Sequence, residues 1–91
     1  MVRRSRLEIY FDILEVIGKG TTKPTQIMYR TNLSWSVLQD MFETLTNGGF
    51  IIEETKLNSK RYYVTDKGKS ALTYHFRSLE GLDNIKKIIS R

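Results

Sequence analysis

Apolar residues recur at helical spacing in three stretches of the first half of the chain. Their period predicts a first helix over residues 4–17, a short second helix from Pro24 to residue 29 or 30, and a third helix over residues 34–47. Gly18 and Gly20 end the first helix, and Gly48-Gly49 ends the third, because glycine readily adopts the conformation that closes a helix. The positions expected to face the core are Leu7, Tyr10, Phe11, Leu14, Ile17, Ile27, Met28, Leu38, Met41, Phe42 and Leu45.

The connection between the second and third helices is short and polar. It consists of Arg30, Thr31 and Asn32, and Asn32 is suited to the left-handed conformation that most residues avoid. Ser34 follows, and its hydroxyl group can cap the third helix. Two helices joined by so tight a turn predict a helix-turn-helix, in which the third helix is the candidate recognition helix.

The second half of the chain changes to a strand pattern. Residues 50–55 and 61–64 are rich in β-branched and aromatic residues and flank the largely polar segment 56–60, which predicts a β-hairpin, here called the wing. Thr65 can cap a last helix that continues, after an interruption at Gly81, toward residue 89. The expected fold is α+β and mainly α, a winged helix-turn-helix with three helices, a β-hairpin wing and a C-terminal helix. It forms a single domain over residues 1–91, with a dimerisation helix over about 65–90.

Composition narrows the class of function. The 91 residues carry a net charge of +5 and a pI near 9.6, which favours a polyanionic partner. Because the chain has no cysteine, disulfides and thiolate chemistry are excluded, and a reducing compartment such as the cytoplasm fits. No apolar run approaches the roughly 20 residues that span a bilayer, and the N-terminus lacks a signal-peptide pattern. We therefore expect neither membrane insertion nor export.

Two stretches of the chain resemble a known family. Residues 26–35, Gln-Ile-Met-Tyr-Arg-Thr-Asn-Leu-Ser-Trp, and residues 49–51 with 63–68 are similar to the helix-turn-helix, wing and final cap of small archaeal winged-helix proteins of the Sso-ten-a type. The resemblance spans most of the chain. It implies a cytoplasmic, chromosome-associated protein that binds double-stranded DNA as a transcriptional regulator or chromatin component and forms a homodimer through its C-terminal helix. The short last helix, interrupted at Gly81, departs from the longer coiled-coil segment of that family.

The wing supplies the clearest candidates for DNA contact. Lys56, Lys60 and Arg61 are three cations with no acid between them, and most protein contacts to DNA fall on phosphates. An Asn58-Ser59 tip is small and polar enough to follow the backbone or enter a minor groove. The alternative is a hairpin turn that is polar only for solvation.

The start of the third helix offers a second group of candidates. Ser36 and Gln39 can reach base edges in the major groove, whereas Asp40 and Glu43 would be repelled by phosphates, so contact is expected in the first turn. Trp35 either stacks on a sugar or a thymine methyl group or anchors the helix to the core, and the second interpretation is favoured. The candidates are Ser34, Trp35, Ser36 and Gln39.

Further cations lie in the N-terminal arm and around the second helix. The arm either covers the phosphate backbone or is simply a solvated end, and the second helix touches the backbone in related folds. The candidates are Arg3, Arg4, Arg6, Lys23 and Arg30.

The last helix carries apolar residues at spacings of three or four, which form either a dimer seam or part of the core. Beyond Gly81 a 91-residue chain has little core left to cover them, so a homodimer is expected. The candidate dimerisation residues are Leu79, Leu82, Ile85, Ile88 and Ile89.

Catalysis is not expected. The single histidine, His75, lies in an apolar helical pattern, and no phosphate loop, metal-binding spacing or cofactor motif accompanies it. The rival to DNA binding is a protein–protein interaction module, supported by the acidic residues Asp40, Glu43, Glu53 and Glu54. A continuous basic surface would favour DNA, and scattered charge would favour protein docking.

Overall fold

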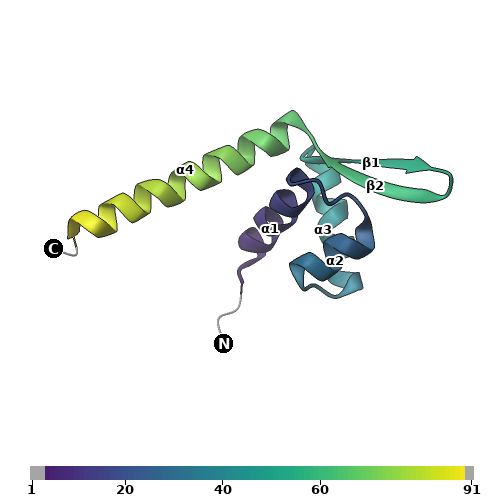
Figure 1. The fold of residues 1–91 in the computed structure, drawn as a ribbon, viewed down its shortest axis with the longest axis horizontal. Coiled ribbons are helices and arrows are strands. Elements are labelled where there is room, and N and C mark those ends of the chain that lie inside the picture. The colour runs from purple at the N-terminus through teal and green to yellow at the C-terminus, as the bar shows by residue number, and fades with distance from the viewer. Residues whose placement is uncertain (1–3, 90–91) are drawn as a thin grey trace.

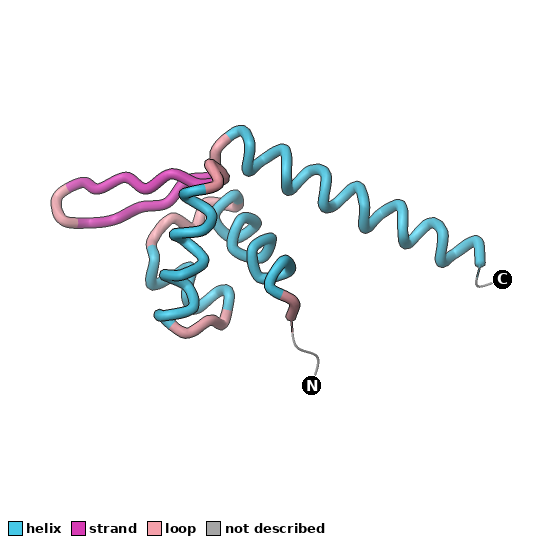
Figure 2. Tube along the Cα trace, turned by 180° about the vertical axis from the view of Figure 1, so that it is seen from behind, coloured by secondary structure: helices cyan, strands magenta, loops and turns pink. Residues whose placement is uncertain are grey.

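The order of the elements confirms the predicted fold. The computed structural model describes the backbone of residues 4–89 and the side chains of residues 4–79. The elements are α1 (Arg6–Gly18), α2 (Pro24–Thr31), α3 (Trp35–Asn47), β1 (Ile51–Lys56), β2 (Ser59–Val64) and α4 (Asp66–Ile89). In Figure 1 the first three helices form the body, and the wing (β1 and β2) and α4 project from it in opposite directions. Figure 2 shows the same arrangement from behind.

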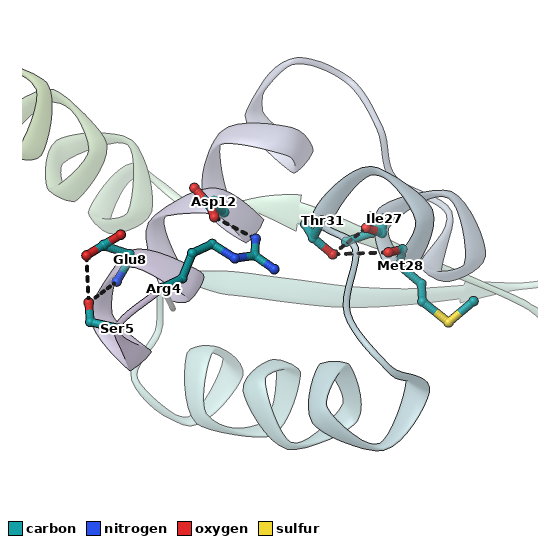
Figure 3. Close-up of polar contacts among 7 residues, drawn as sticks. All are labelled: Arg4, Ser5, Glu8, Asp12, Ile27, Met28 and Thr31. Atoms are coloured by element: carbon teal, nitrogen blue, oxygen red, sulfur yellow. Dashed lines mark hydrogen bonds and ion pairs between the residues drawn. The ribbon is translucent and has the colours of Figure 1, made fainter. Parts of the chain in front are cut away.

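Local side-chain caps set the starts and ends of the short helices. The Ser5 hydroxyl accepts a hydrogen bond from the Glu8 amide at 3.1 Å, as Figure 3 shows, and Ser34 does the same for Val37 at 3.3 Å. Asn32 ends α2 with φ 56° and ψ 41°, the left-handed conformation that the sequence predicts. Asn32 and Ser34 thus keep the turn between α2 and α3 short.

The core lies where α1, α2 and α3 meet the base of the wing. It consists of Ile13, Leu14, Ile17, Ile27, Leu38, Met41, Phe42, Leu45, Ile51 and Tyr62. Thr31 is buried among them, and its hydroxyl donates to the Ile27 carbonyl at 2.7 Å (Figure 3). The prediction for Leu7 was wrong: it is 63% exposed, because it lies in the first turn of α1, where the helix extends past the core.

The wing is a tighter hairpin than the sequence predicts. β1 and β2 pair antiparallel out to Lys56 opposite Ser59, so the turn consists only of Leu57 and Asn58. The predicted Asn58-Ser59 tip is therefore wrong by one residue. Both turn residues have positive φ, 50° and 65°, which is the two-residue turn whose twist matches that of the paired strands.

A compact junction joins the end of α3 to the start of α4. The Thr65 hydroxyl donates to the Gly49 carbonyl at 2.6 Å and accepts from the Gly68 amide at 3.1 Å, which confirms the predicted cap. The Lys67 ammonium group donates to the Gly48 carbonyl at 2.7 Å. Lys67 is thus held by the fold, and the direction of α4 is fixed relative to the wing.

Gly68 allows this close approach, and replacing it with alanine tests the junction. A Cβ atom there would lie 2.3 Å from the Phe50 carbonyl oxygen and 2.6 Å from a Val64 methyl group. We expect Gly68→Ala to lower the free energy of unfolding by about 1–3 kcal/mol, as overpacking does, measured by urea denaturation. Ser70→Ala, an exposed position on the same helix, is the control, and equal stabilities of the two variants would contradict the packing described.

The last helix continues without a break through Gly81 to Ile89, so the predicted interruption was wrong. A single glycine costs a helix only about 1 kcal/mol relative to alanine, which does not force a break. α4 packs on α1 through His75, whose ring stacks on Phe11 with centroids 3.9 Å apart. Within the described part of the chain, no helix is both long and apolar enough to cross a membrane.

Candidate nucleic-acid interface

The first turn of α3 is open to solvent. Ser34 caps it and Ser36 is exposed, while Gln39 one turn later is half-buried. Trp35 is 48% exposed, so the favoured interpretation, that it anchors the helix to the core, was wrong. The buried residues of α3 begin with Leu38, and a residue three positions earlier at the helix start extends beyond the core. This leaves an exposed indole beside polar side chains.

Acidic side chains follow one turn further along α3. Asp40 accepts a hydrogen bond from Arg6 of α1 at 3.1 Å, and Arg6 also donates to the Tyr10 hydroxyl at 2.8 Å. The bond to Asp40, and then that to Tyr10, raises the pKa of the Arg6 guanidinium group. Part of the negative charge of α3 is therefore neutralised by α1, while Glu43 is exposed.

A cleft about 520 Å³ in volume separates α3 from the wing. Its walls include Asp40 and Glu43 on the helix and Glu53, Lys60 and Tyr62 on the wing. Burial, and then the neighbouring Glu53 carboxylate, raises the pKa of the Tyr62 phenol, which stays neutral at physiological pH. The floor of the cleft is therefore uncharged and its rim is mostly acidic.

The start of α2 lies beside the base of the wing. The Tyr62 amide of β2 donates to the Thr22 carbonyl at 3.0 Å, so Lys23, next in the chain after Thr22, lies near the wing base. Lys23 and Arg30 are both exposed. Among the described residues, neither forms an ion pair with a carboxylate.

The register of the hairpin divides the three wing cations between its two faces. Lys56 and Arg61 share a face, since they lie opposite Ser59 and Glu54 at alternate positions. Lys60 is on the other face, which turns toward α3, and its ammonium group lies 3.4 Å from the Glu53 carboxylate. Lys56 and Arg61 make no ion pair with any described carboxylate. The positive charge of the wing is thus strongest on its outer face and near its tip.

The N-terminal arginines are placed differently from the predicted arm. Arg4 forms an ion pair with Asp12 at 2.8 Å (Figure 3), and Arg6 pairs with Asp40 as described above. Arg3 lies outside the described residues. Arg4 is therefore held against α1, and Arg6 is held against Asp40, which also lines the cleft between α3 and the wing.

The two most exposed large apolar side chains among the described residues were not among the sequence candidates. Tyr29 is 79% exposed at the end of α2, and Leu57 is fully exposed at the wing tip. The helical spacing could have indicated that Tyr29 is exposed, because Ile27 and Thr31 are the buried residues of α2 and Tyr29, midway between them, faces outward.

Within residues 4–79, no three His, Asp or Glu side chains gather as metal ligands do.

The candidate dimerisation residues are only partly described. Leu79 is 44% exposed, and Phe76 and Tyr74 nearby are 41% and 76% exposed. Leu82, Ile85, Ile88 and Ile89 lie outside the residues whose side chains the structure describes. An apolar face therefore continues on α4 beyond its contact with α1.

A family comparison agrees with this geometry. A model of the family described as winged helix-turn-helix matches residues 3–87. The chain belongs to the winged helix-turn-helix family. The match covers the body, the wing and nearly all of α4, so the family includes every element of the fold.

A curated relative of this winged helix-turn-helix protein comes from an archaeon. The uncharacterized protein MJ0287 of Methanocaldococcus jannaschii is 36% identical over 67 residues, which are 74% of this chain and 65% of the relative. This winged helix-turn-helix protein thus spans just under two thirds of the relative's length.

Solved structures with this winged helix-turn-helix fold include Sso10a-2, a DNA-binding protein from Sulfolobus solfataricus. It is 28% identical, with a TM-score of 0.75 over 96% of this chain and 94% of that one. This likeness confirms the resemblance to the Sso-ten-a proteins. FabT of Streptococcus pneumoniae, solved in complex with DNA, is 22% identical, with a TM-score of 0.71 over 97% of this chain and 66% of that one. It shares the fold.

Proposed function

We propose that this protein binds double-stranded DNA and acts without catalysis, as a small transcriptional regulator or chromatin-associated protein in the cytoplasm. The observation that carries the proposal is the open first turn of α3, accompanied by exposed cations at the two ends of α2 and on the wing. Membership of the winged helix-turn-helix family and the likeness to a DNA-binding archaeal protein support it.

The first turn of α3 is the part that reaches the bases in this proposal. Ser36 donates to or accepts from several base edges, and Gln39 is suited to bidentate pairing with adenine in the major groove. Trp35, exposed at the helix start, stacks on a sugar or contacts a thymine methyl group. Because Asp40 and Glu43 follow, α3 enters the groove by its N-terminal end, away from its acidic half.

The cations hold the protein on the phosphate backbone. Lys23, which directly precedes α2, and Arg30 of α2 contact one side of the groove. The wing residues Lys56 and Arg61 contact the backbone or enter the adjacent minor groove. Lys60 contributes less than its charge suggests, since it lies near Glu53. Contacts of this kind release counterions and make the affinity depend strongly on salt.

A homodimer through α4 completes the proposal, with residues 1–91 as one domain. The exposed apolar side chains of α4 up to Leu79 and the apolar spacing through Leu82, Ile85, Ile88 and Ile89 supply the seam. A two-fold dimer with suitable geometry presents two recognition helices about 34 Å apart, which matches half-sites one helical turn apart.

Sedimentation velocity tests this dimer. We expect the wild type to sediment as a dimer at micromolar concentration and Leu79→Glu to shift toward the monomer, because a charge in an apolar seam is costly to bury. Thr73→Glu, also exposed on α4, is the control and should remain dimeric. A wild type that stays monomeric at every concentration would remove the dimer from the proposal.

A protein-docking function is the second candidate, and the acidic rim of the cleft between α3 and the wing favours it. A basic protein segment would fit that cleft, whereas DNA would avoid it. The two candidates therefore differ in which part of α3 they use, its first turn for DNA and its acidic side for protein, although Gln39 lines the cleft as well.

Nuclear magnetic resonance spectroscopy of the ¹⁵N-labelled protein, titrated with a short random duplex, distinguishes them. DNA binding predicts shifts of the Trp35 indole N–H, the Ser36 and Gln39 amides and the wing amides over residues 56–61. Thr73 and Tyr74 on α4 serve as internal references that should not move. A spectrum unchanged by duplex would remove the proposed function and favour docking on protein.

A further inference from the structure

The turn of the wing contains a residue that the turn itself does not favour. Leu57 and Asn58 are its two central residues, and both have positive φ. Turns of this type strongly prefer asparagine, aspartate or glycine, because a bulky side chain crowds the backbone in the left-handed region. Asn58 meets this preference, whereas Leu57 carries a conformational cost.

Leu57 gains nothing from the fold in return. Its side chain is 100% exposed, more than that of any other large apolar residue in the described part of the chain; Tyr29 follows at 79%. It packs on no neighbour, and its apolar surface is entirely in water. The free energy of folding therefore supplies no reason for leucine at this position.

The surroundings of Leu57 indicate what kind of partner would cover it. Lys56 precedes it and the polar residues Asn58 and Ser59 follow, with Lys60 exposed after them. The hairpin carries this tip away from the body, as both views show (Figures 1 and 2). Leu57 is therefore an isolated apolar side chain flanked by cations and polar residues. Such a tip is suited to a polyanion that has an apolar interior close beneath its charged surface.

A DNA duplex has this organisation. The minor groove is about 6 Å wide between two rows of phosphates, which admits a single side chain that projects from the tip of a hairpin. Apolar side chains, leucine among them, insert between base steps from the minor groove and bend the duplex. A lipid surface has charged headgroups above an apolar interior as well, but one leucine gives it little apolar area to bury.

We propose that Leu57 is a wedge that inserts between base pairs from the minor groove and bends the DNA. The inference rests on the proposed DNA binding and adds a structural outcome to it. Lys56 and Arg61 deliver the tip to the groove by contacting its phosphates, and Leu57 then separates two stacked bases. The bend brings the flanking duplex closer to the body of the protein.

The test uses the full chain and a random duplex carrying a fluorescence donor at one end and an acceptor at the other. Anisotropy of the duplex reports binding, and energy transfer at saturation reports bending. Leu57→Asn removes the wedge and places a residue that the turn prefers, so the hairpin is retained. Thr55→Ser changes an exposed residue of β1 two positions before Leu57 and keeps the leucine, which makes it the matched control.

We expect the wild type and Thr55→Ser to raise energy transfer at saturation. Leu57→Asn should bind with most of the wild-type affinity but without the rise in energy transfer, because phosphate contacts supply most of the affinity. The wedge would be overturned, with DNA binding left intact, by either of two results. One is equal energy transfer for Leu57→Asn and the wild type, and the other is a duplex saturated with wild-type protein that shows no rise in energy transfer. Absence of an anisotropy change with the wild type would remove DNA binding itself. A flotation assay with anionic phospholipid vesicles tests the alternative partner. If the wild type floats with the vesicles, Leu57→Asn does not, and the two proteins give equal energy transfer with DNA, the tip binds lipid instead.

Discussion

Replacing Phe42 with alanine is expected to lower the free energy of unfolding by about 3–5 kcal/mol, the usual loss for a buried phenylalanine. Phe42 of α3 is 3% exposed, and its ring stacks on Tyr62 of β2 with centroids 4.0 Å apart and planes 19° apart. The substitution leaves a cavity between α3 and the wing. Since single domains are stable by only about 5–15 kcal/mol, the variant should lie close to its unfolding threshold.

Urea denaturation followed by circular dichroism measures this destabilisation. Thr46→Ala on the exposed side of the same helix is the control and should change stability by no more than about 0.5 kcal/mol. A decrease below about 1 kcal/mol for Phe42→Ala would mean that the stack does not hold the wing against α3. The prediction concerns function too, because the packing of Phe42 on Tyr62 fixes the distance between the helix and the hairpin.

Removing the three wing cations is expected to weaken binding to every duplex, whatever its sequence. In the variant with Lys56, Lys60 and Arg61 all changed to alanine, the slope of log affinity against log salt should fall by up to about 0.9 for each phosphate that the wing no longer neutralises. The total fall should be smaller than that for three phosphates, because Lys60 lies 3.4 Å from Glu53. Sequence preference, which base contacts supply, should remain.

A second variant with alanine at Lys19, Lys69 and Arg77 controls for net charge. It removes the same number of cations from the end of α1 and from α4, outside the proposed interface. Its salt slope should stay close to that of the wild type. If both variants show equal decreases in affinity and slope, the wing has no special part and binding reflects net charge alone.

Much of this fold follows from short-range signals in the sequence. Asn32, Ser34 and Thr65 act through hydrogen bonds within a few residues or at a single junction, so their caps could be predicted from residue type and position. Leu38, Met41, Phe42 and Leu45 repeat at the helical period, and all four are buried. Local chemistry therefore predicts the order of the elements and the buried face of α3.

The sequence predictions fail where the outcome depends on the tertiary position of a residue or on a residue that does not follow its usual preference. Trp35 and Leu7 have apolar side chains, but each lies in the first turn of its helix, beyond the core, and no local signal shows this. The hydrogen bond between Arg6 and Asp40 joins residues 34 positions apart, which a pattern along the chain does not reveal. Leucine is uncommon in the kind of turn that Leu57 occupies. Turn propensities therefore placed the tip at Asn58-Ser59, one residue too late.

The central claim, that this winged helix-turn-helix protein binds double-stranded DNA, is tested most directly by fluorescence anisotropy of a labelled random duplex titrated with the purified protein at several salt concentrations. We expect micromolar or tighter binding at low salt, with affinity falling steeply and linearly on a log–log plot as salt increases. Absence of binding at the lowest salt concentration, or binding that does not depend on salt, would contradict the claim.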